Sequence, residues 1–379
     1  MNYDIRFPSV ADLKRRARMR MPGFAFDYVD AGIDDEKCKA RNRDAWHRVQ
    51  LIPRYLRDVS AANLQTRLFG REYAMPFGVS PVGLGNMMWP GAERALARAA
   101  QLENIPYILS TFGTTALEEI AATAPDVCWF QLYVPKKEEV MEDLLRRARD
   151  ANCHALVVTL DIPVGAKRNR ELKNALKLPF APTPKILRQC LARPAWLLRT
   201  LMHGAPDFAT VARYREGANE NLADFITRFN MHGVTRERLE KIRALWDGPM
   251  ILKGLQHAED LRAAAEIGVD GVIISNHGGR QLDAAPASAE SLRAVPDEIR
   301  ERLTLMVDGG IRSGLDVVRA KALGAQAAFS GRAFFWGVGA LGARGAAQVA
   351  GIFRDEMERA LRQLGCGAFE KMDRSWLAD

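Results

Sequence analysis

The sequence predicts an α/β protein, a (β/α)8 TIM barrel with a helical cap at its N-terminus and a long excursion after the fourth strand. Eight short apolar runs follow one another from residue 77 onward. Each run is continuous, as expected for parallel strands buried on both faces. Amphipathic segments of helix length separate most of the runs. In 265–275 and 321–330 a helical pattern stops at a glycine before the next strand. An open doubly wound sheet is the alternative, but it rarely needs eight such units.

The predicted elements follow in chain order. The cap and a short hairpin occupy residues 1–70, and the excursion occupies about 162–233. We expect one domain over 1–379, with the barrel at about 71–365. Among the barrel helices are 137–152, 235–246, 257–268 and 313–324. The strands are expected at 77–81, 107–111, 129–134, 155–161, 250–254, 271–278, 303–310 and 327–332.

The composition is that of a globular protein, with 48% hydrophobic and 26% charged residues and a net charge of +8. A basic balance fits an acidic substrate, a phosphate cofactor, nucleic acid or an anionic membrane, or merely a solvated surface. No nucleic-acid-binding motif accompanies the charge, so no nucleic-acid partner is expected. Five cysteines without a CxxC pair predict neither a disulfide framework nor a metal site, and indicate a reducing cytoplasmic compartment. Neither a membrane-spanning stretch nor a secretory signal is visible.

Polar residues stand where the predicted strands end. Barrel enzymes place their chemistry on this rim. So many polar groups would be costly to desolvate on one rim unless a ligand bound there. They are Ser80 to Gly83, Ser110, Thr111, Gln131, Tyr133, Thr159, Asp161, Lys253, Ser275, His277, Asp308 to Gly310, and Ser330 to Arg332.

The last two strands suggest a phosphate. Residues 308–314 (DGGIRSG) and 330–332 (SGR) combine glycines, hydrogen-bond donors and arginines near helix starts. Barrels commonly hold a phosphate after strands seven and eight. The alternative is that these glycines only make tight turns.

His277 stands at a strand end, three residues before Arg280. A base and a cation on one rim suit an anionic substrate that must lose a proton, although a structural histidine is the plainer alternative. Asp161 would orient the imidazole and stabilise its protonated form. Lys253 would place positive charge against a ring that becomes anionic on reduction.

Several of these stretches together resemble the FMN-dependent α-hydroxy acid dehydrogenases and oxidases, in particular their lactate and mandelate dehydrogenase branch. The resemblance runs from FDYVDAG (26–32) to the last long helix. It rests on FQLYV (130–134), Thr159 to Asp161, LKG (252–254), SNHGGRQLD (275–283), DGGIRSG (308–314) and GR (331–332).

The resemblance implies a role for each matching residue. His277 would be the base that takes a proton from the substrate and Asp161 would pair with it. Arg280 and Arg168 would clamp the substrate carboxylate, with Arg170 close enough in sequence to be an alternative to Arg168. Tyr28 and Tyr133 would donate hydrogen bonds to the carboxylate and the reacting oxygen. FMN would be held by Pro81, Val82, Gly83, Ser110, Gln131, Thr159, Lys253 and Ser275, with Asp308, Gly310, Arg312, Gly331 and Arg332 around its ribityl chain and phosphate.

The implied reaction oxidises an (S)-2-hydroxy acid, lactate- or mandelate-like, to the 2-oxo acid. Hydride transfer and prior removal of the α-proton both remain open. Val82 and Gly83 stand where many oxidases of the family have Thr and Ala, which favours a quinone or another carrier over O2. Phe112 replaces a tryptophan of glycolate oxidases, so a larger substrate side chain is expected to fit. A glycolate-type oxidase, a non-redox FMN isomerase and a flavin-bearing scaffold are the alternatives.

The excursion mixes cations with Pro, Trp, Leu and Phe. Residues about 176–215 resemble a segment that lies in a membrane interface, while a lid or a protein-binding patch would have similar composition. We expect a peripheral protein on the cytoplasmic side of a bacterial inner membrane, or a cytoplasmic one. The resemblance also implies a homotetramer.

Overall fold

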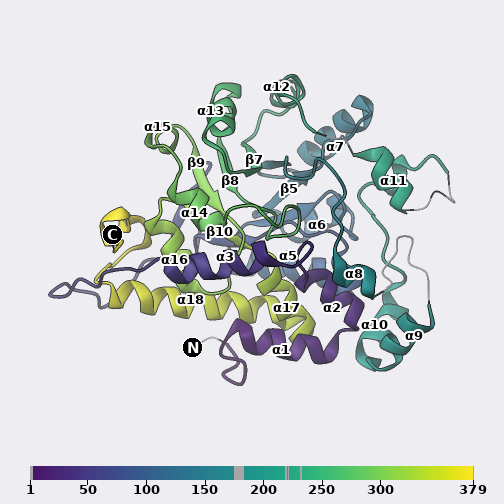
Figure 1. The fold of residues 1–379 in the computed structure, drawn as a ribbon, viewed down its shortest axis with the longest axis horizontal. Coiled ribbons are helices and arrows are strands. Elements are labelled where there is room, and N and C mark those ends of the chain that lie inside the picture. The colour runs from purple at the N-terminus through teal and green to yellow at the C-terminus, as the bar shows by residue number, and fades with distance from the viewer. Residues whose placement is uncertain (1–2, 175–182, 218–219, 221, 231–232, 379) are drawn as a thin grey trace.

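The structure is a computed structural model that describes residues 3–174, 183–217, 220, 222–230 and 233–378. Eight parallel strands close into a barrel in the order β10-β3-β4-β5-β6-β7-β8-β9, which confirms the predicted barrel and excludes the open sheet (Figure 1). The strands are β3 (Phe77–Val79), β4 (Tyr107–Ser110), β5 (Cys128–Leu132), β6 (Leu156–Thr159), β7 (Met250–Leu255), β8 (Gly271–Ile274), β9 (Thr304–Val307) and β10 (Ala327–Ser330).

Most strands end earlier than the sequence pattern predicts. β6 ends at Thr159, two residues before Asp161, and β9 ends at Val307, directly before Asp308. Asp308 still donates its backbone N–H to the Ile274 carbonyl at 3.1 Å, but the chain then turns, since Gly309 and Gly310 adopt φ of +89°. This left-handed backbone needs glycine. The polar rim is therefore part strand and part loop. Within strands lie Ser110, Gln131, Thr159, Lys253 and Ser330, whereas Asp161, Ser275, His277 and Asp308 follow the strand ends.

Helices cover the outside of the barrel, and the four predicted ones are present. Glycine ends α13 at Gly268, with φ of +81°, and Ser313 caps α16 by accepting a hydrogen bond from the Asp316 amide. The helices are α4 (Gly85–Met88), α5 (Ala92–Glu103), α6 (Leu117–Thr123), α7 (Glu138–Asp150), α12 (Arg236–Leu245), α13 (Ala258–Ile267), α14 (Ser288–Arg293), α15 (Asp297–Arg300), α16 (Gly314–Ala322), α17 (Arg332–Leu341) and α18 (Gly345–Gln363), with short turns η2 (Gly342–Arg344), η3 (Phe369–Lys371) and η4 (Arg374–Trp376).

The N-terminal cap is helical, as predicted, and ends in a hairpin. It comprises α1 (Val10–Arg20), α2 (Gly23–Asp30), α3 (Lys37–Arg48), β1 (Thr66–Leu68) and β2 (Arg71–Tyr73). α1 packs along α17. The indole Nε1 of Trp46, on α3, donates to the Gly309 carbonyl at 2.8 Å. The cap thereby reaches the strand-end rim, where it can supply residues to a site.

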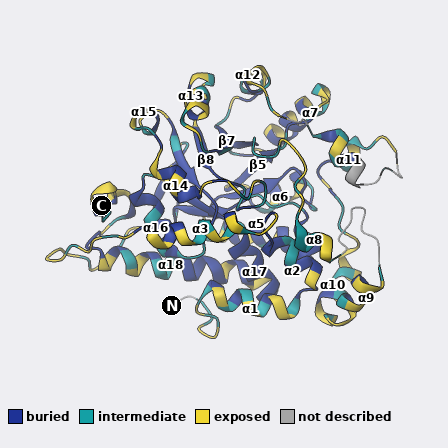
Figure 2. Cartoon of the chain, viewed as in Figure 1, coloured by how far each residue is buried: buried dark blue, intermediate teal, exposed yellow. Residues whose placement is uncertain are grey.

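The excursion projects beyond the barrel at one edge, in teal in Figure 1. It holds α8 (Asn169–Lys173), α9 (Pro184–Leu191), α10 (Pro194–His203), η1 (Ala212–Tyr214) and α11 (Leu222–Phe229). Figure 2 shows exposed residues on α9 and α10. Three exposed apolar residues of α10 are Leu198, Leu201 (73% exposed) and Met202 (74%). Trp196 instead faces inward, where its Nε1 donates to the Met88 carbonyl at 3.0 Å. In the described residues, no helix combines the length and apolar character needed to cross a bilayer.

Candidate active site

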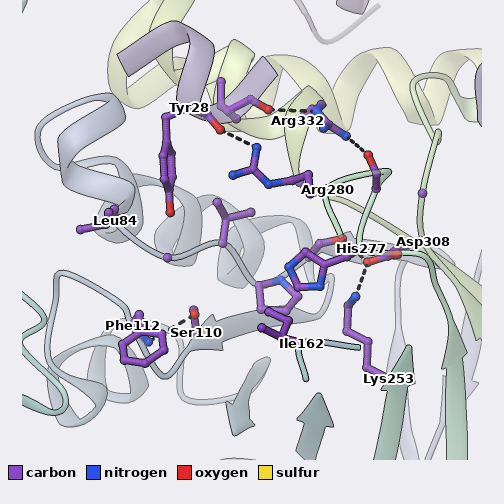
Figure 3. A pocket seen from close by; sticks show the side chains of 18 of the residues that line it. Tyr28, Leu84, Ser110, Phe112, Ile162, Lys253, His277, Arg280, Asp308 and Arg332 are labelled. Atoms are coloured by element: carbon purple, nitrogen blue, oxygen red, sulfur yellow. Dashed lines mark hydrogen bonds and ion pairs between the residues drawn. The ribbon is translucent and has the colours of Figure 1, made fainter. Parts of the chain in front are cut away.

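A cavity of about 450 Å³ opens at the carboxyl ends of the strands. Its volume lies within the range of small-molecule sites. The cap, the strand ends and the excursion all contribute to its wall (Figure 3). The predicted residues that line it are Tyr28, Pro81, Val82, Gly83, Ser110, Tyr133, Arg168, Lys253, His277, Arg280, Asp308, Gly310, Arg312, Gly331 and Arg332. Four other predicted residues are not among the lining residues: Gln131, Thr159, Asp161 and Ser275.

His277 is fixed on two sides. Its Nδ1 lies 2.9 Å from Oδ1 of Asp161, and its backbone N–H donates to Oγ of Ser275 at 3.0 Å. The residue has φ of +57°, so the loop turns sharply to present the ring. Since an ionised carboxylate only accepts, Nδ1 must carry the proton, which leaves Nε2 as the basic atom.

The electrostatics keep this imidazole neutral. Burial lowers the pKa of His277, and Lys253 and Arg168 add to the lowering against the opposing effect of Asp161. For Asp161 the balance is reversed. Burial would raise its pKa, but His277 and Lys253 outweigh that effect and lower it. The pair is therefore an uncharged base beside an ionised carboxylate at neutral pH.

Two arginines form the cationic part of the wall, and a carboxylate lies between them. Arg280 donates through Nη1 to the carbonyl of Tyr28 (2.7 Å) and through Nη2 to Oε1 of Glu171 (3.0 Å). Nη1 of Arg168 lies 3.5 Å from Oε2 of Glu171. Arg170 turns away to Asp27, Asp30 and Glu36. The structure thus brings Arg168, and not Arg170, to the cavity.

Lys253 belongs to a buried network below the cavity. Its Nζ donates to Oγ of Ser275 at 2.8 Å and lies 3.1 Å from Oδ2 of Asp308. Ser275 in turn donates to Asp308. Burial acts to lower the pKa of Lys253, but Asp308 and Asp161 outweigh it and raise the pKa. Lys253 is accordingly a fixed positive charge in the cavity wall, beside Asp308 (Figure 3).

The wall fits a flavin with a phosphate. Gln131 Nε2 and Thr159 Oγ1 are buried and have no hydrogen-bond partner within the described residues, as expected of groups that bind a polar ring edge. A Cβ at Gly331 would lie 2.9 Å from Val82 Cγ2, so only glycine lets the backbone approach there. Burial and neighbouring cations lower the pKa of Arg312, and they lower that of Arg332 to about 10. An anion between these arginines would relieve that repulsion.

Arg332 is also structural. Its guanidinium donates to the carbonyls of Val29 (2.9 Å), Gly278 (2.7 Å) and Ala31 (2.8 Å). These bonds join the start of α17 to the end of α2 and to the loop that carries His277. Arg332 therefore holds the cap against the rim in addition to lining the cavity.

Phe112 was expected beside the substrate, and it does line the cavity. Other residues of the wall were not predicted from the sequence. Glu171 lies three residues after Arg168, and its charge and spacing were the available signal. The excursion residues carried no motif. The lining residues that the sequence did not predict include Leu84, Ile162, Glu171, Phe208, Ile226 and Asn230.

Comparison with known proteins supplies the family. The model of a family described as FMN-dependent dehydrogenase matches residues 17–379. An L-lactate dehydrogenase of Caulobacter sp. (strain K31) is 38% identical over 373 residues, 98% of each chain. One from Pseudomonas syringae pv. syringae is 38% identical over 374 residues, 97% of this chain and 98% of the relative.

Solved structures agree with these relatives. The crystal structure of the monotopic membrane protein (S)-mandelate dehydrogenase superposes with a TM-score of 0.92 at 33% identity, covering 98% of each chain. That of a mandelate oxidase gives a TM-score of 0.83 at 36% identity, covering 96% of each.

Proposed function

Because this chain belongs to the family of FMN-dependent dehydrogenases, flavoenzymes that oxidise 2-hydroxy acids, we propose that its substrate is an (S)-2-hydroxy acid and that its electrons leave to a quinone or another carrier. One observation carries the proposal. The neutral imidazole of His277, which is paired with ionised Asp161, meets the cations of Arg168 and Arg280 at the same cavity. A base beside two carboxylate-binding groups is what deprotonation of an anionic hydroxy acid requires.

The proposed roles follow from the contacts. Arg168 and Arg280 bind the substrate carboxylate and so orient the α-carbon. Holding the reacting groups in the right geometry lowers the barrier to reaction. Nε2 of His277 takes a proton from the substrate, and Asp161 stabilises the imidazolium that forms. Tyr133 acts as a hydrogen-bond donor, since burial raises the pKa of its phenol and keeps it protonated. FMN, when bound, accepts the two electrons of the oxidation.

The roles proposed for the FMN-binding residues follow from the chemistry of their side chains. Lys253 would place its charge against the flavin, supported by Ser275 and Asp308. Ser110 donates to Oε1 of Gln131 at 3.1 Å, which leaves the Gln131 Nε2 to donate to the flavin. Pro81, Val82, Gly83 and Thr159 would border the ring system, and Gly310, Arg312, Gly331 and Arg332 would bind the phosphate.

The acceptor is inferred from Gly83. A Cβ added there would lie 3.2 Å from both Cβ and the carbonyl oxygen of Phe112, a tight contact that would require a shift of a few tenths of an ångström. Glycine at this position fits a branch of the family that passes electrons to a carrier, and a glycolate-type oxidase is the alternative.

The excursion supports attachment to a membrane surface. Helices α9 and α10 expose Leu187, Leu191, Leu198, Leu201 and Met202. Lys185, Arg188 and Arg199 on the same two helices would face lipid phosphates, each worth about 1 kcal/mol near an anionic surface. A similar structure is that of a monotopic membrane protein. We propose that 183–215 lies on the cytoplasmic face of the inner membrane; residues 176–182 of the predicted segment fall outside the described residues.

An anaerobic substrate panel tests the function. The purified protein is expected to be yellow and to bleach on addition of L-lactate or (S)-mandelate. A quinone analogue should restore the colour faster than air does. A yellow protein that no 2-hydroxy acid bleaches would favour a non-redox FMN barrel, and rapid reoxidation by air would favour an oxidase. Light scattering of the holoprotein would test the predicted homotetramer.

A further inference from the structure

A carboxylate of the chain itself binds the two arginines that are proposed to hold the substrate. Glu171 lines the cavity beside Arg168 and Arg280. Its Oε1 accepts a hydrogen bond from Nη2 of Arg280 at 3.0 Å, and its Oε2 lies 3.5 Å from Nη1 of Arg168. One carboxylate thus bridges two guanidinium groups, which is the arrangement proposed for the carboxylate of the hydroxy acid.

The guanidinium groups are also held by uncharged acceptors, independently of Glu171. Nη1 of Arg280 donates to the carbonyl of Tyr28 at 2.7 Å (Figure 3). Nη2 of Arg168 donates to Oε1 of Gln281 at 3.2 Å, and its Nε donates to the Arg280 carbonyl at 3.4 Å. Each arginine therefore has one terminal nitrogen fixed by neutral groups and directs the other to Glu171. Positioning of the two cations does not depend on the Glu171 carboxylate.

The backbone of Glu171 is anchored to the cap, whereas its side chain is not. Its neighbour Arg170 binds Asp27 and Asp30, and Asn174 donates through Nδ2 to Asp27 at 2.5 Å. The Glu171 side chain itself lies at the cavity and is 15% exposed. Rotation of this side chain would free both guanidinium nitrogens without a movement of α8.

The balance of charge favours exchange of the two carboxylates over sharing. Arg168 and Arg280 carry two positive charges and Glu171 carries one negative charge, which leaves one net positive charge. Burial and Arg168 lower the pKa of Arg280, and Glu171 opposes them. Two carboxylates at the same pair of nitrogens would repel each other. Glu171 therefore stabilises the paired cations and competes with any carboxylate that enters.

The further inference rests on the proposed function. We propose that Glu171 is a resident counter-anion, which the substrate carboxylate displaces from Arg168 and Arg280 and which returns when the 2-oxo acid leaves. Glu171 thereby weakens the binding of substrate and product alike, because both carry the same carboxylate. It takes no part in the proton transfer assigned to His277. Its effect is on affinity and on product release, and not on the chemical step.

The test compares wild-type holoenzyme with Glu171→Gln, which keeps the size of the side chain and removes its charge. The ligand is the 2-oxo acid formed from the hydroxy acid that bleaches the flavin, and binding is followed by the flavin absorbance. We expect Kd to fall about tenfold or more, since one negative charge beside the bound carboxylate is removed. Binding of the uncharged amide, (S)-mandelamide, should not tighten. KM for the acid should fall, while flavin reduction at saturating acid stays within about threefold of wild type.

Two more variants separate this effect from a general loss of charge or of folding. Glu36→Gln removes another partly buried carboxylate, paired with Lys39 and Arg170 and outside the cavity lining, and should leave Kd unchanged. Glu171→Asp keeps the charge but draws the carboxylate back by one methylene. It should lower Kd by a smaller factor than Glu171→Gln, and it provides the test if the glutamine variant does not fold.

A folded Glu171→Gln that binds the 2-oxo acid no more tightly than wild type would overturn the inference, and so would a Glu171→Asp with weaker binding. Equal tightening of the amide and the acid would also overturn it, because the effect would then not depend on charge. If no 2-hydroxy acid bleaches the wild-type flavin, the proposed function itself fails. That failure appears in wild type alone and is therefore distinguishable from failure of the inference.

Discussion

Replacing Asp161 by asparagine separates two effects of this carboxylate on His277. Asparagine has the same shape, which matters because Asp161 packs tightly on Gly254, where an added Cβ would meet the Asp161 Cβ at 2.6 Å. The change removes the charged acceptor 2.9 Å from Nδ1 of His277. Stabilisation of the imidazolium is lost, while the packing remains.

The expected loss of rate follows from the value of that bond. A hydrogen bond to a charged group contributes about 1.5–3 kcal/mol. At about 1.36 kcal/mol per factor of ten, kcat for Asp161→Asn should fall roughly 10- to 150-fold.

Although Asp161→Asn should lower the rate, it should extend activity to lower pH. Burial, Lys253 and Arg168 lower the pKa of His277, and Asp161 raises it, so removal of the carboxylate lowers that pKa further. A base is active only above its pKa. The acid limb of the pH profile of kcat/KM should therefore move to lower pH in Asp161→Asn, although the maximal rate is lower.

Anaerobic stopped-flow reduction of the flavin across pH measures both quantities. Asp150→Asn, an exposed change on α7, is the control for loss of an acidic residue. An acid limb that moves to higher pH, or a rate equal to wild type, would refute the assigned coupling between His277 and Asp161.

Three other variants test the remaining parts of the site and the surface. Arg280→Lys keeps the charge but loses the planar fork, so KM for the acid should rise about 10- to 100-fold by steady-state assay; an unchanged KM would contradict the carboxylate clamp. Lys253→Met leaves Asp308 buried without its cation and should lower the free energy of unfolding by about 3–5 kcal/mol in a denaturant titration, whereas unchanged stability would contradict a buried ion pair. Leu198→Asp with Leu201→Asp should reduce co-sedimentation with anionic vesicles about tenfold or more, and undiminished binding would exclude α10 from the membrane contact.

The barrel was predictable because continuous apolar strands and glycine-ended helices are local signals. The rim residues were predictable for the same reason, since the end of a strand fixes the position of the next few residues in the chain. His277, Lys253 and Asp308 accordingly converge as expected. The contacts of their side chains depend on long-range packing, as in the network where the Ser275 hydroxyl links Lys253 to Asp308.

Other features depend on contacts that no local pattern encodes. Arg168 and Arg170 are the same residue type and stand two positions apart, and it is the acidic cap residues Asp27 and Asp30 that draw Arg170 away. Trp196 contributed to an interfacial composition, yet it packs edge-on against Phe24 at 5.6 Å and anchors α10 from within. The residues of the irregular excursion that reach the cavity could not be predicted, because the course of the folded chain, and not a local pattern, brings them there.

The most direct test of the central claim is single-turnover flavin reduction in His277→Asn. Asparagine tolerates the left-handed backbone of this position, so the loop can keep its conformation. We predict that the variant purifies yellow and is reduced by dithionite like wild type. Its reduction by an (S)-2-hydroxy acid should slow by about 10²- to 10⁴-fold, the usual contribution of a general base. Reduction by the acid at the wild-type rate would contradict the assignment of His277 as the base.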